Sequence, residues 1–185
     1  MKSNRNLNIF STSIVIRALN EARHIGKLLY GLKQQTKLPD EIILVDSGST
    51  DDTLMIASSY DVKIVKIKKN EFSFGKALNI GCEEASKEIL IFVSAHVYPS
   101  DKNWLQNLIK PFIDSKVVCS YGKQRGDRKT KYSENQIFNS WFPEDINDIK
   151  TKYFCNNANC AIRKSVWNEY QYDENLTGLE DLDWA

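Results

Sequence analysis

Short apolar runs alternate with amphipathic stretches through the first two thirds of this 185-residue chain, and this alternation limits the fold more than any other feature. The apolar runs are residues 13–17 (SIVIR), 41–46 (EIILVD), 62–67 and 88–93 (EILIFV). The last of these is apolar at nearly every position, which is typical of a central strand covered on both faces. Strands that alternate with helices predict an α/β fold with a mostly parallel central sheet flanked by helices.

The stretches between these runs have helical spacing or helix-start signals. After the first strand, apolar residues follow the i, i+3, i+4, i+7 pattern at Ile25, Leu28, Leu29 and Leu32, with Asn20 and Glu21 as capping candidates. Ser49, Thr50 and Asp51 are expected to cap a helix that reaches residue 60. Further helices are predicted at 75–86, 101–113, 133–141, 163–170 and from 180, and further strands at 116–121 and 159–162.

Composition indicates an ordinary globular domain. Apolar residues make up 42% and charged residues 26%, close to the usual mix of roughly 45–50% and about 25%. At 185 residues the chain is expected to form one domain or most of one. With 25 basic and 24 acidic side chains and no single-sign tail, the sequence does not indicate a nucleic-acid partner.

The cysteines and the absence of targeting signals favour a reducing cytoplasm. Cys82, Cys119, Cys155 and Cys160 form no CxxC pair and are interpreted as buried thiols. The polar start does not resemble a signal peptide, and no stretch approaches the ~20 apolar residues of a membrane span. We expect the chain to be cytoplasmic, with membrane contact limited to peripheral contact on the inner face.

Residues that follow the strands are the first candidates for a site, because ligands of open α/β sheets bind at the carboxyl ends of the strands. Three segments qualify, namely 17–21, 46–51 (DSGSTD) and 94–96. By itself DSGSTD fits a well-capped turn as well as a ligand site. The sequence lacks both GxGxxG and GxxxxGK[ST], so a dinucleotide fold or a P-loop has little support.

Taken in order, four segments resemble the family 2 glycosyltransferases. They are SIVIRALNEARHIGKLLYGLKQQT, DEIILVDSGSTDDT, FSFGKALNIGCEEASKEILIFVSAH and the acidic GLEDLDWA. The resemblance covers the chain from Ser13 to Trp184. It implies a GT-A fold with a Rossmann-like sheet, here expected to be truncated at its C-terminus, that binds a nucleoside-diphosphate sugar and a divalent metal. The resemblance further implies that residues 1–121 form a nucleotide-sugar-binding half and residues 122–185 an incomplete acceptor-side half of the same domain.

The resemblance also assigns donor contacts. Asp46 corresponds to the aspartate that hydrogen-bonds the nucleobase, with Ser47 beside it. Arg17 would flank the base and Glu21 would close the pocket. Lys76 falls where the family often has a base or phosphate contact, although a solvated helix lysine is an equal interpretation.

The turn Ser94-Ala95-His96 stands where the family commonly has Asp-x-Asp. Ser94 and Ala95 would then adjoin the ribose and diphosphate, and His96 would be the ligand of Mn²⁺ or Mg²⁺. A neutral imidazole offsets less charge than a carboxylate, so dependence on metal is an open question. The alternative is a hydrogen-bonded histidine that closes the strand.

The acidic end resembles the Glu-Asp motif of the family. The match makes Asp181 the general base that takes the proton of the acceptor hydroxyl, with Glu180 supporting it. Without the match, a helix start stabilised by its dipole explains both residues. The amides of Asn156, Asn157 and Asn159 could bind sugar hydroxyls or satisfy a turn. The basic loop carries Lys123, Arg125, Arg128, Lys129 and Lys131, and fits a solvated loop, a diphosphate cover or an anionic membrane contact.

The predicted activity is inverting transfer of a hexosyl or deoxyhexosyl residue from a nucleoside-diphosphate sugar to a hydroxyl of a glycan or lipid-linked acceptor, in surface polysaccharide biosynthesis. A non-catalytic nucleotide-sugar-binding or interaction module is the alternative. Nucleotidyl transfer ranks third because no glycine-rich basic signature follows the first strand.

Overall fold

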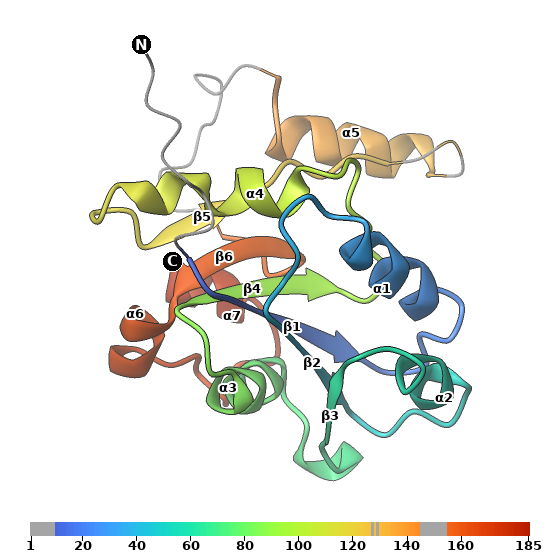
Figure 1. Ribbon diagram of the computed structural model, residues 1–185. Helices are drawn as coiled ribbons and strands as arrows, with labels where there is room; N and C mark the ends of the chain where they lie inside the picture. Colours follow the sequence, from blue (N-terminus) through green and yellow to red (C-terminus); the bar gives the residue numbers. More distant parts are fainter. Residues whose placement is uncertain (1–9, 127, 129, 145–154) are drawn as a thin grey trace.

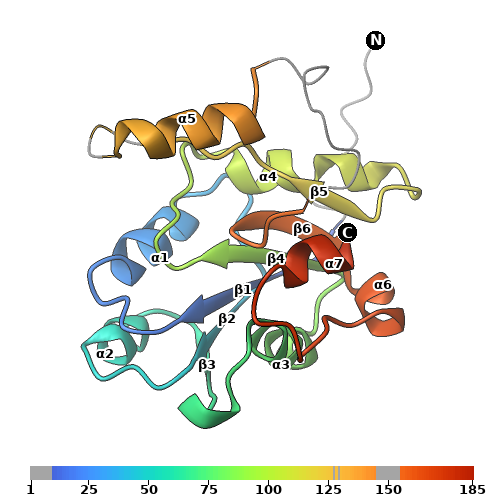
Figure 2. The same cartoon turned by 180° about the vertical axis from the view of Figure 1, so that it is seen from behind.

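A six-stranded sheet between two layers of helices forms the molecule, seen from opposite sides in Figures 1 and 2. This computed structural model describes residues 10–126, 128, 130–144 and 155–185. The strand order is β3-β2-β1-β4-β6-β5. The predicted mostly parallel sheet flanked by helices is confirmed.

Four neighbouring strands run parallel and two do not. The parallel strands are β1 (Thr12–Ala18), β2 (Glu41–Asp46), β3 (Lys63–Lys66) and β4 (Ile89–Ser94). Strand β6 (Asn159–Arg163) lies antiparallel between β4 and β5 (Cys119–Tyr121). The residues before and after position 121 therefore share one sheet.

The strand register brings three strand ends together. Ala18 lies opposite Asp46 in the β1–β2 pair, and Arg17 lies opposite Ser94 in the β1–β4 pair. The carboxyl ends of β1, β2 and β4 thus meet at one edge of the sheet, where ligands of such sheets bind.

The helices cover both faces of the sheet. They are α1 (Ile25–Lys33), α2 (Thr53–Ala57), α3 (Phe74–Glu84), α4 (Trp104–Ile109), α5 (Tyr132–Trp141), α6 (Lys164–Glu169) and α7 (Glu180–Trp184), with 3-10 turns η2 (Lys69–Glu71) and η3 (Lys110–Ile113). Alternation along β1 divides the core: Ile14 and Ile16 pack with α1 and α4, whereas Val15 packs with α3 and α7. Helix α7 lies over the β4 and β6 part of the sheet (Figure 2).

Glycine at position 81 lets α3 approach the sheet closely. A Cβ atom there would lie 2.3 Å from Cγ1 of Val15 and 3.1 Å from Cγ2 of Val45. The small residue therefore sets the spacing between α3 and the first two strands.

Most predicted elements are confirmed, and their ends account for the differences. Strand β2 matches the prediction residue for residue. Helix α1 begins at Ile25 after a turn that starts at Glu21, with His24 at the N-cap position and no side-chain cap, while the Asn20 side chain accepts from the N–H of Thr50. Helix α2 ends at Ala57 rather than residue 60, and the helix predicted at 101–113 changes to a 3-10 turn near Pro111, which lacks an N–H donor. The predicted strand 116–121 is reduced to three residues.

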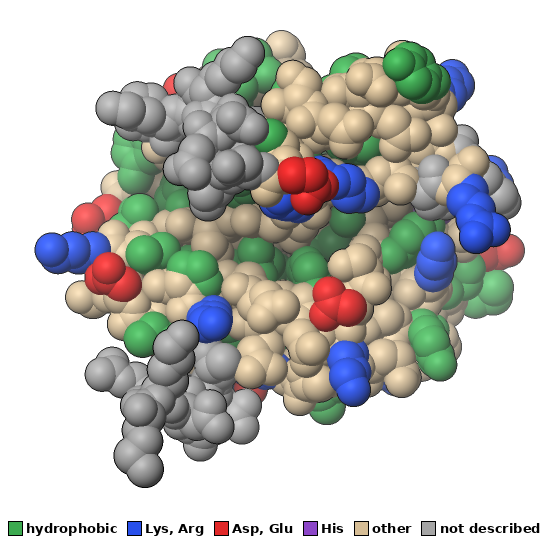
Figure 3. All heavy atoms as spheres, turned by 90° about the horizontal axis from the view of Figure 1, so that it is seen from above, with side chains coloured by type: hydrophobic (Ala, Val, Ile, Leu, Met, Phe, Trp, Pro, Cys, Tyr) green, Lys and Arg blue, Asp and Glu red, His purple; other side chains and the backbone are tan. Residues whose placement is uncertain are grey.

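The surface and the cysteines agree with a globular domain. Basic and acidic side chains are interspersed on the side where α4 and α5 lie (Figure 3). All four cysteines are free thiols, and three of them are buried. Among the described residues, no helix is long and apolar enough to cross a bilayer.

Candidate active site

The carboxylate of Asp46 organises the turn that follows β2. It accepts hydrogen bonds from the backbone N–H of Gly48 at 3.1 Å and of Ser49 at 3.1 Å, and Asp46 is 2% exposed. Gly48 has a φ of 97°, in the left-handed region that glycine occupies without strain. Two backbone bonds leave part of the acceptor capacity of the carboxylate unused. The predicted nucleobase contact therefore starts from a fixed carboxylate at the sheet edge.

The rest of the DSGSTD segment fastens the loop after β1. Ser49 Oγ accepts from the N–H of Asn20 at 2.9 Å, and Asn20 Oδ1 accepts from the N–H of Thr50 at 2.8 Å. Asp51 accepts from the N–H of Ala22 at 3.0 Å. A hydrogen bond from Thr53 is the main cause that lowers the pKa of Asp51. The motif thus joins two loops at the carboxyl edge of the sheet.

This fastening positions Glu21 against His96. The N–H of Glu21 donates to Thr53 Oγ1 at 2.7 Å, and its Oε1 lies 3.0 Å from His96 Nδ1. The His96 side chain is 60% exposed, and its ring lies edge-on to His24 at 6.3 Å between centroids. The structure therefore brings together two residues that the sequence assigned to the donor pocket and the metal.

Glu21 and His96 do not by themselves build a metal centre. Within the described part of the chain, no group of three or more His, Cys, Asp or Glu side chains could hold a metal ion. Ala95 is buried, and Ser94 is half-buried with its N–H donating to the carbonyl of Ala158 at 3.3 Å. The described residues therefore offer too few ligands for a metal ion by themselves, and a bound ligand would have to supply the rest.

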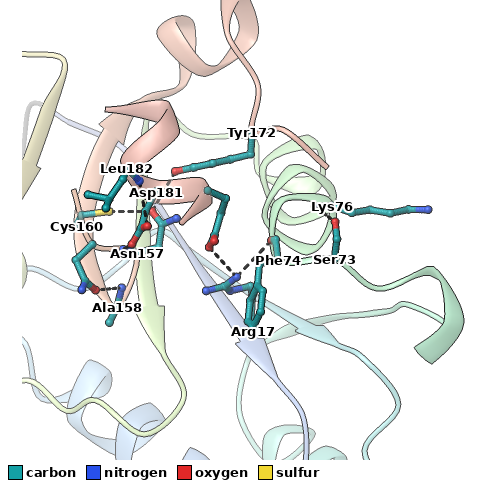
Figure 4. Close-up of polar contacts among 12 residues, drawn as sticks. Arg17, Ser73, Phe74, Lys76, Asn157, Ala158, Cys160, Tyr172, Asp181 and Leu182 are labelled. Carbon is teal, nitrogen blue, oxygen red and sulfur yellow. Dashed lines mark hydrogen bonds and ion pairs between the residues drawn. The ribbon is translucent and has the colours of Figure 1, made fainter. Parts of the chain in front are cut away.

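An ion pair joins the first strand to the last helix. Arg17 NH1 lies 3.1 Å from Glu180 Oε1 and donates to the carbonyl of Phe74 at 3.3 Å (Figure 4). The Glu180 side chain is only 7% exposed. Arg17 and Glu180, which the sequence assigned to different roles, are thus direct partners.

Asp181 stands beside this pair with a different environment. It is half-buried, and it accepts from the backbone N–H of Asn157 at 3.4 Å and of Leu182 at 3.0 Å (Figure 4). Burial and, to a smaller extent, the nearby Glu180 raise its pKa. Leu179, just before the acidic pair, has a φ of 63°, which is rare for a residue with a branched side chain. A carboxylate of raised pKa is a better proton acceptor than an exposed one.

Asn157 links Asp181 to a buried network. Its Oδ1 accepts from the hydroxyl of Tyr172 at 3.1 Å, while its Nδ2 is buried and has no hydrogen-bond partner among the described residues. Asn79 continues the network by binding the carbonyl of Tyr172 at 2.9 Å. Sequence reasoning missed Tyr172 and Asn79, because no motif marks them and only the packing of α3 against the C-terminal segment joins them.

Lys76, also predicted to contact the donor, lies apart from Arg17 and Asp181. It lies in the first turn of α3, where its N–H donates to the capping Ser73 Oγ at 3.1 Å. Its side chain points away from Arg17 and Asp181 (Figure 4). The phosphate contact assigned to Lys76 stays a prediction.

The fold and these motifs define the class of the protein. Residues 13–171 match the family model described as Glycosyl transferase family 2. The chain belongs to this family, and the fold is the GT-A fold predicted from the sequence.

Curated relatives include bacterial glycosyltransferases. The chain is 27% identical over 183 residues to the O-antigen chain rhamnosyltransferase RfbN of Salmonella typhimurium strain LT2, covering 92% of this chain and 58% of that protein. It is 29% identical to WbaN, the O-antigen chain rhamnosyltransferase of Salmonella anatum, covering 75% of this chain and 47% of that protein. The chain thus spans about half the length of these relatives.

Solved structures share the fold. Staphylococcus aureus TarS 1-349 in complex with UDP-GlcNAc superposes with a TM-score of 0.72 at 24% identity, covering 94% of this chain and 52% of that chain. The mannosyltransferase PcManGT from Pyrobaculum calidifontis, in complex with GDP-Man and Mn²⁺, superposes with a TM-score of 0.73 at 19% identity, covering 95% and 50%.

Proposed function

We propose that this chain is the catalytic part of an inverting glycosyltransferase. It moves a hexosyl or deoxyhexosyl residue from a nucleoside-diphosphate sugar to a hydroxyl of a glycan or lipid-linked acceptor in surface polysaccharide biosynthesis. The observation that carries the proposal is the half-buried Asp181 carboxylate, held by backbone N–H groups at the carboxyl edge of the sheet. The O-antigen rhamnosyltransferases among the relatives support this class of product.

Asp181 acts as the general base in this proposal. Inversion requires attack on the anomeric carbon from the face opposite the departing diphosphate, so the base must lie on the acceptor side. Its carboxylate takes the proton of the acceptor hydroxyl as that oxygen bonds to the anomeric carbon and the bond to the diphosphate breaks. Arg17 neutralises Glu180, which limits the repulsion between the two adjacent carboxylates.

The donor lies along the ends of β1, β2 and β4 in the proposal. Asp46 and Ser47 face the base, Arg17 and Glu21 flank it, and Ser94 with Ala95 adjoins the ribose and diphosphate. The complexes of TarS with UDP-GlcNAc and of PcManGT with GDP-Man and Mn²⁺ support a nucleotide-sugar donor, and the latter supports a divalent metal. His96 is the proposed protein ligand if the donor diphosphate supplies the remaining oxygens.

Transfer assays with a matched pair of variants test the proposal. UDP-, dTDP- and GDP-sugars are supplied with a surface-glycan acceptor, and nucleoside diphosphate release is measured. We expect Asp181→Asn to lower the transfer rate by roughly 100-fold or more, since general base catalysis contributes about 10²–10⁴. Asp183→Asn, an exposed carboxylate of the same helix, is the control and should keep most activity. Equal rates for the two variants would remove Asp181 from the mechanism.

A nucleotide-sugar-binding module is the second candidate. It is favoured by the turn Ser94-Ala95-His96 and by the small number of metal-ligand side chains near it in the described residues. Donor binding in calorimetry, together with no release of sugar or nucleoside diphosphate over hours, would support this module and exclude turnover.

A further inference from the structure

A cavity of about 740 Å³ lies next to the donor edge of the sheet. Its walls come from the start of α1, the loop that follows β4, and the segment that follows β5. The described charged side chains and histidines that line it are Arg23, His24, Lys27, His96, Lys123, Arg125 and Glu144. Four permanent cations and one carboxylate leave this lining, here called the basic pocket, with an excess of positive charge.

The two walls of the basic pocket differ in how their cations are paired. Arg125 NH2 lies 2.7 Å from Glu144 Oε1 and Lys123 Nζ lies 3.5 Å from Glu144 Oε2, so one carboxylate serves two cations. On the α1 wall, neither Arg23 nor Lys27 has an ion-pair partner in the part of the chain that the structure describes. Lys27 Nζ instead lies 3.8 Å from the centroid of the Tyr98 ring. This wall keeps uncompensated positive charge.

A neutral hydrogen-bond donor accompanies these cations. Gln124 lines the basic pocket, and its Nε2 is buried with no hydrogen-bond partner among the described residues. Such a donor is costly to leave unpaired, and a ligand oxygen would satisfy it. Guanidinium, ammonium and amide donors around one space match the oxygens of a phosphate or diphosphate.

The position of the basic pocket separates it from the nucleobase side of the site. His96 belongs both to its lining and to the donor edge, whereas Asp46 and Arg17 do not line it. Asn159 and Trp104 form part of its wall and are joined by a hydrogen bond from Trp104 Nε1 to Asn159 Oδ1 at 2.9 Å. Of the described residues assigned to the donor, His96 alone lines the basic pocket, so a ligand there would adjoin the donor without covering its nucleobase side.

We propose that the basic pocket binds an acceptor that carries a phosphate group, with Arg23, Lys27 and Arg125 holding the phosphate oxygens. This inference rests on the proposed function and names the chemistry of its acceptor. The diphosphate of the donor has the same chemistry, so the experiment must separate the two sources.

Calorimetric titration with inorganic pyrophosphate tests the proposal. The protein is first saturated with whichever of UDP, dTDP and GDP it binds, and pyrophosphate is then added. We expect Arg23→Gln/Lys27→Gln to weaken pyrophosphate about tenfold or more, since two charge-assisted contacts are lost. The affinity for the nucleoside diphosphate should stay unchanged. Lys33→Gln, an exposed lysine of the same helix outside the pocket, is the matched control.

Arg125→Gln provides a second variant from the opposite wall and should also weaken pyrophosphate. Unchanged pyrophosphate affinity in both variants would overturn the proposal. Displacement of pyrophosphate by the nucleoside diphosphate would assign the pocket to the donor and overturn the proposal. Equal losses of affinity for the two ligands in the variants would do the same. If the wild-type protein binds no nucleoside diphosphate, that result contradicts the proposed function, and the assignment of the pocket to an acceptor fails as well. Weaker pyrophosphate binding in the variants would still show that the pocket is an anion site.

Discussion

Arg17 and Glu180 meet across 163 positions of sequence, and their contact is the residue-scale feature on which the acidic end depends. Glu180 is nearly buried, so its charge needs a partner, while Arg17 keeps part of its guanidinium in solvent. A buried charge that loses its partner is costly, whereas loss of both partners costs much less. Removing one partner is therefore expected to cost more stability than the attraction between the two charges contributes, and this penalty holds α7 in place.

Removal of Arg17 tests this ion pair. We expect Arg17→Met to lower the free energy of unfolding by about 1–3 kcal/mol, because Glu180 is left buried and unpaired. Glu180→Gln in the same background should restore part of the loss. Urea denaturation of the two single variants and the double variant gives the coupling energy. A coupling energy of zero would mean that the contact does not stabilise α7.

Asp181 makes a pH prediction at the same scale. Its pKa is raised by burial and by Glu180, and the base must be ionised, so the transfer rate should rise with pH through a pKa above the ordinary 3.8. The effect of pH on stability has the opposite direction. Because the pKa of Asp181 is higher in the folded state, this group stabilises the folded state at pH below its unfolded pKa. The contribution is lost as the pH rises through the folded pKa. Asp181→Asn should therefore keep or raise the Tm at pH 7, although it lowers the transfer rate. A lower Tm would show that the ionised carboxylate stabilises the fold.

At the scale of elements, the close approach of α3 to the sheet depends on Gly81. We expect Gly81→Ala to lower the free energy of unfolding by about 1–3 kcal/mol, because the added methyl overlaps Val15 and this outweighs the better helix propensity of alanine. Gly178→Ala, with nothing within 4 Å of the added Cβ, is the control and should change stability by less than about 0.5 kcal/mol. Equal effects in thermal denaturation would contradict the tight packing.

The sequence predicts strands better than helix ends. Strand β2 has a continuous apolar run at 42–45 between Glu41 and Asp46, so the local sequence is enough to predict it. The start of α1 is different, because Asn20 binds Thr50 across two loops and is not available as a cap. Competition between a local cap and a distant partner is decided by tertiary structure, which residue spacing does not contain.

In the candidate site, too, local features are predictable from the sequence and long-range contacts are not. The motifs place Asp46 and His96 at the sheet edge, because each follows a predictable strand. The pairing of Arg17 with Glu180 could not be foreseen, since it depends on how α7 returns to the sheet. The basic pocket likewise needs three distant segments to meet, and only its loop component stood out in the sequence. Lys129 of that loop lies outside the described residues.

At the scale of the whole molecule, donor binding should be visible as a gain in stability. A ligand that binds only the folded state at about 100 times its Kd stabilises it by about 2.7 kcal/mol. For a chain of this size, the Tm should rise by roughly 5–10 °C. Thermal scans with UDP, dTDP and GDP, with and without Mn²⁺, would identify the base and the metal dependence. No shift with any of the three would contradict a nucleotide-binding edge.

The contact between Arg17 and Glu180 joins a strand made early in synthesis to a helix made late. A ribosome delivers β1, β2 and β4 well before α7, and N-terminal parts of a chain generally begin to fold first. Until position 180 emerges, Arg17 lacks its carboxylate partner, while Phe74 offers it a carbonyl at 3.3 Å and a ring with its centroid at 5.0 Å. The turns proposed to receive the nucleotide are therefore synthesised before the proposed general base, so we expect a growing chain to gain affinity for the donor before it can transfer the sugar.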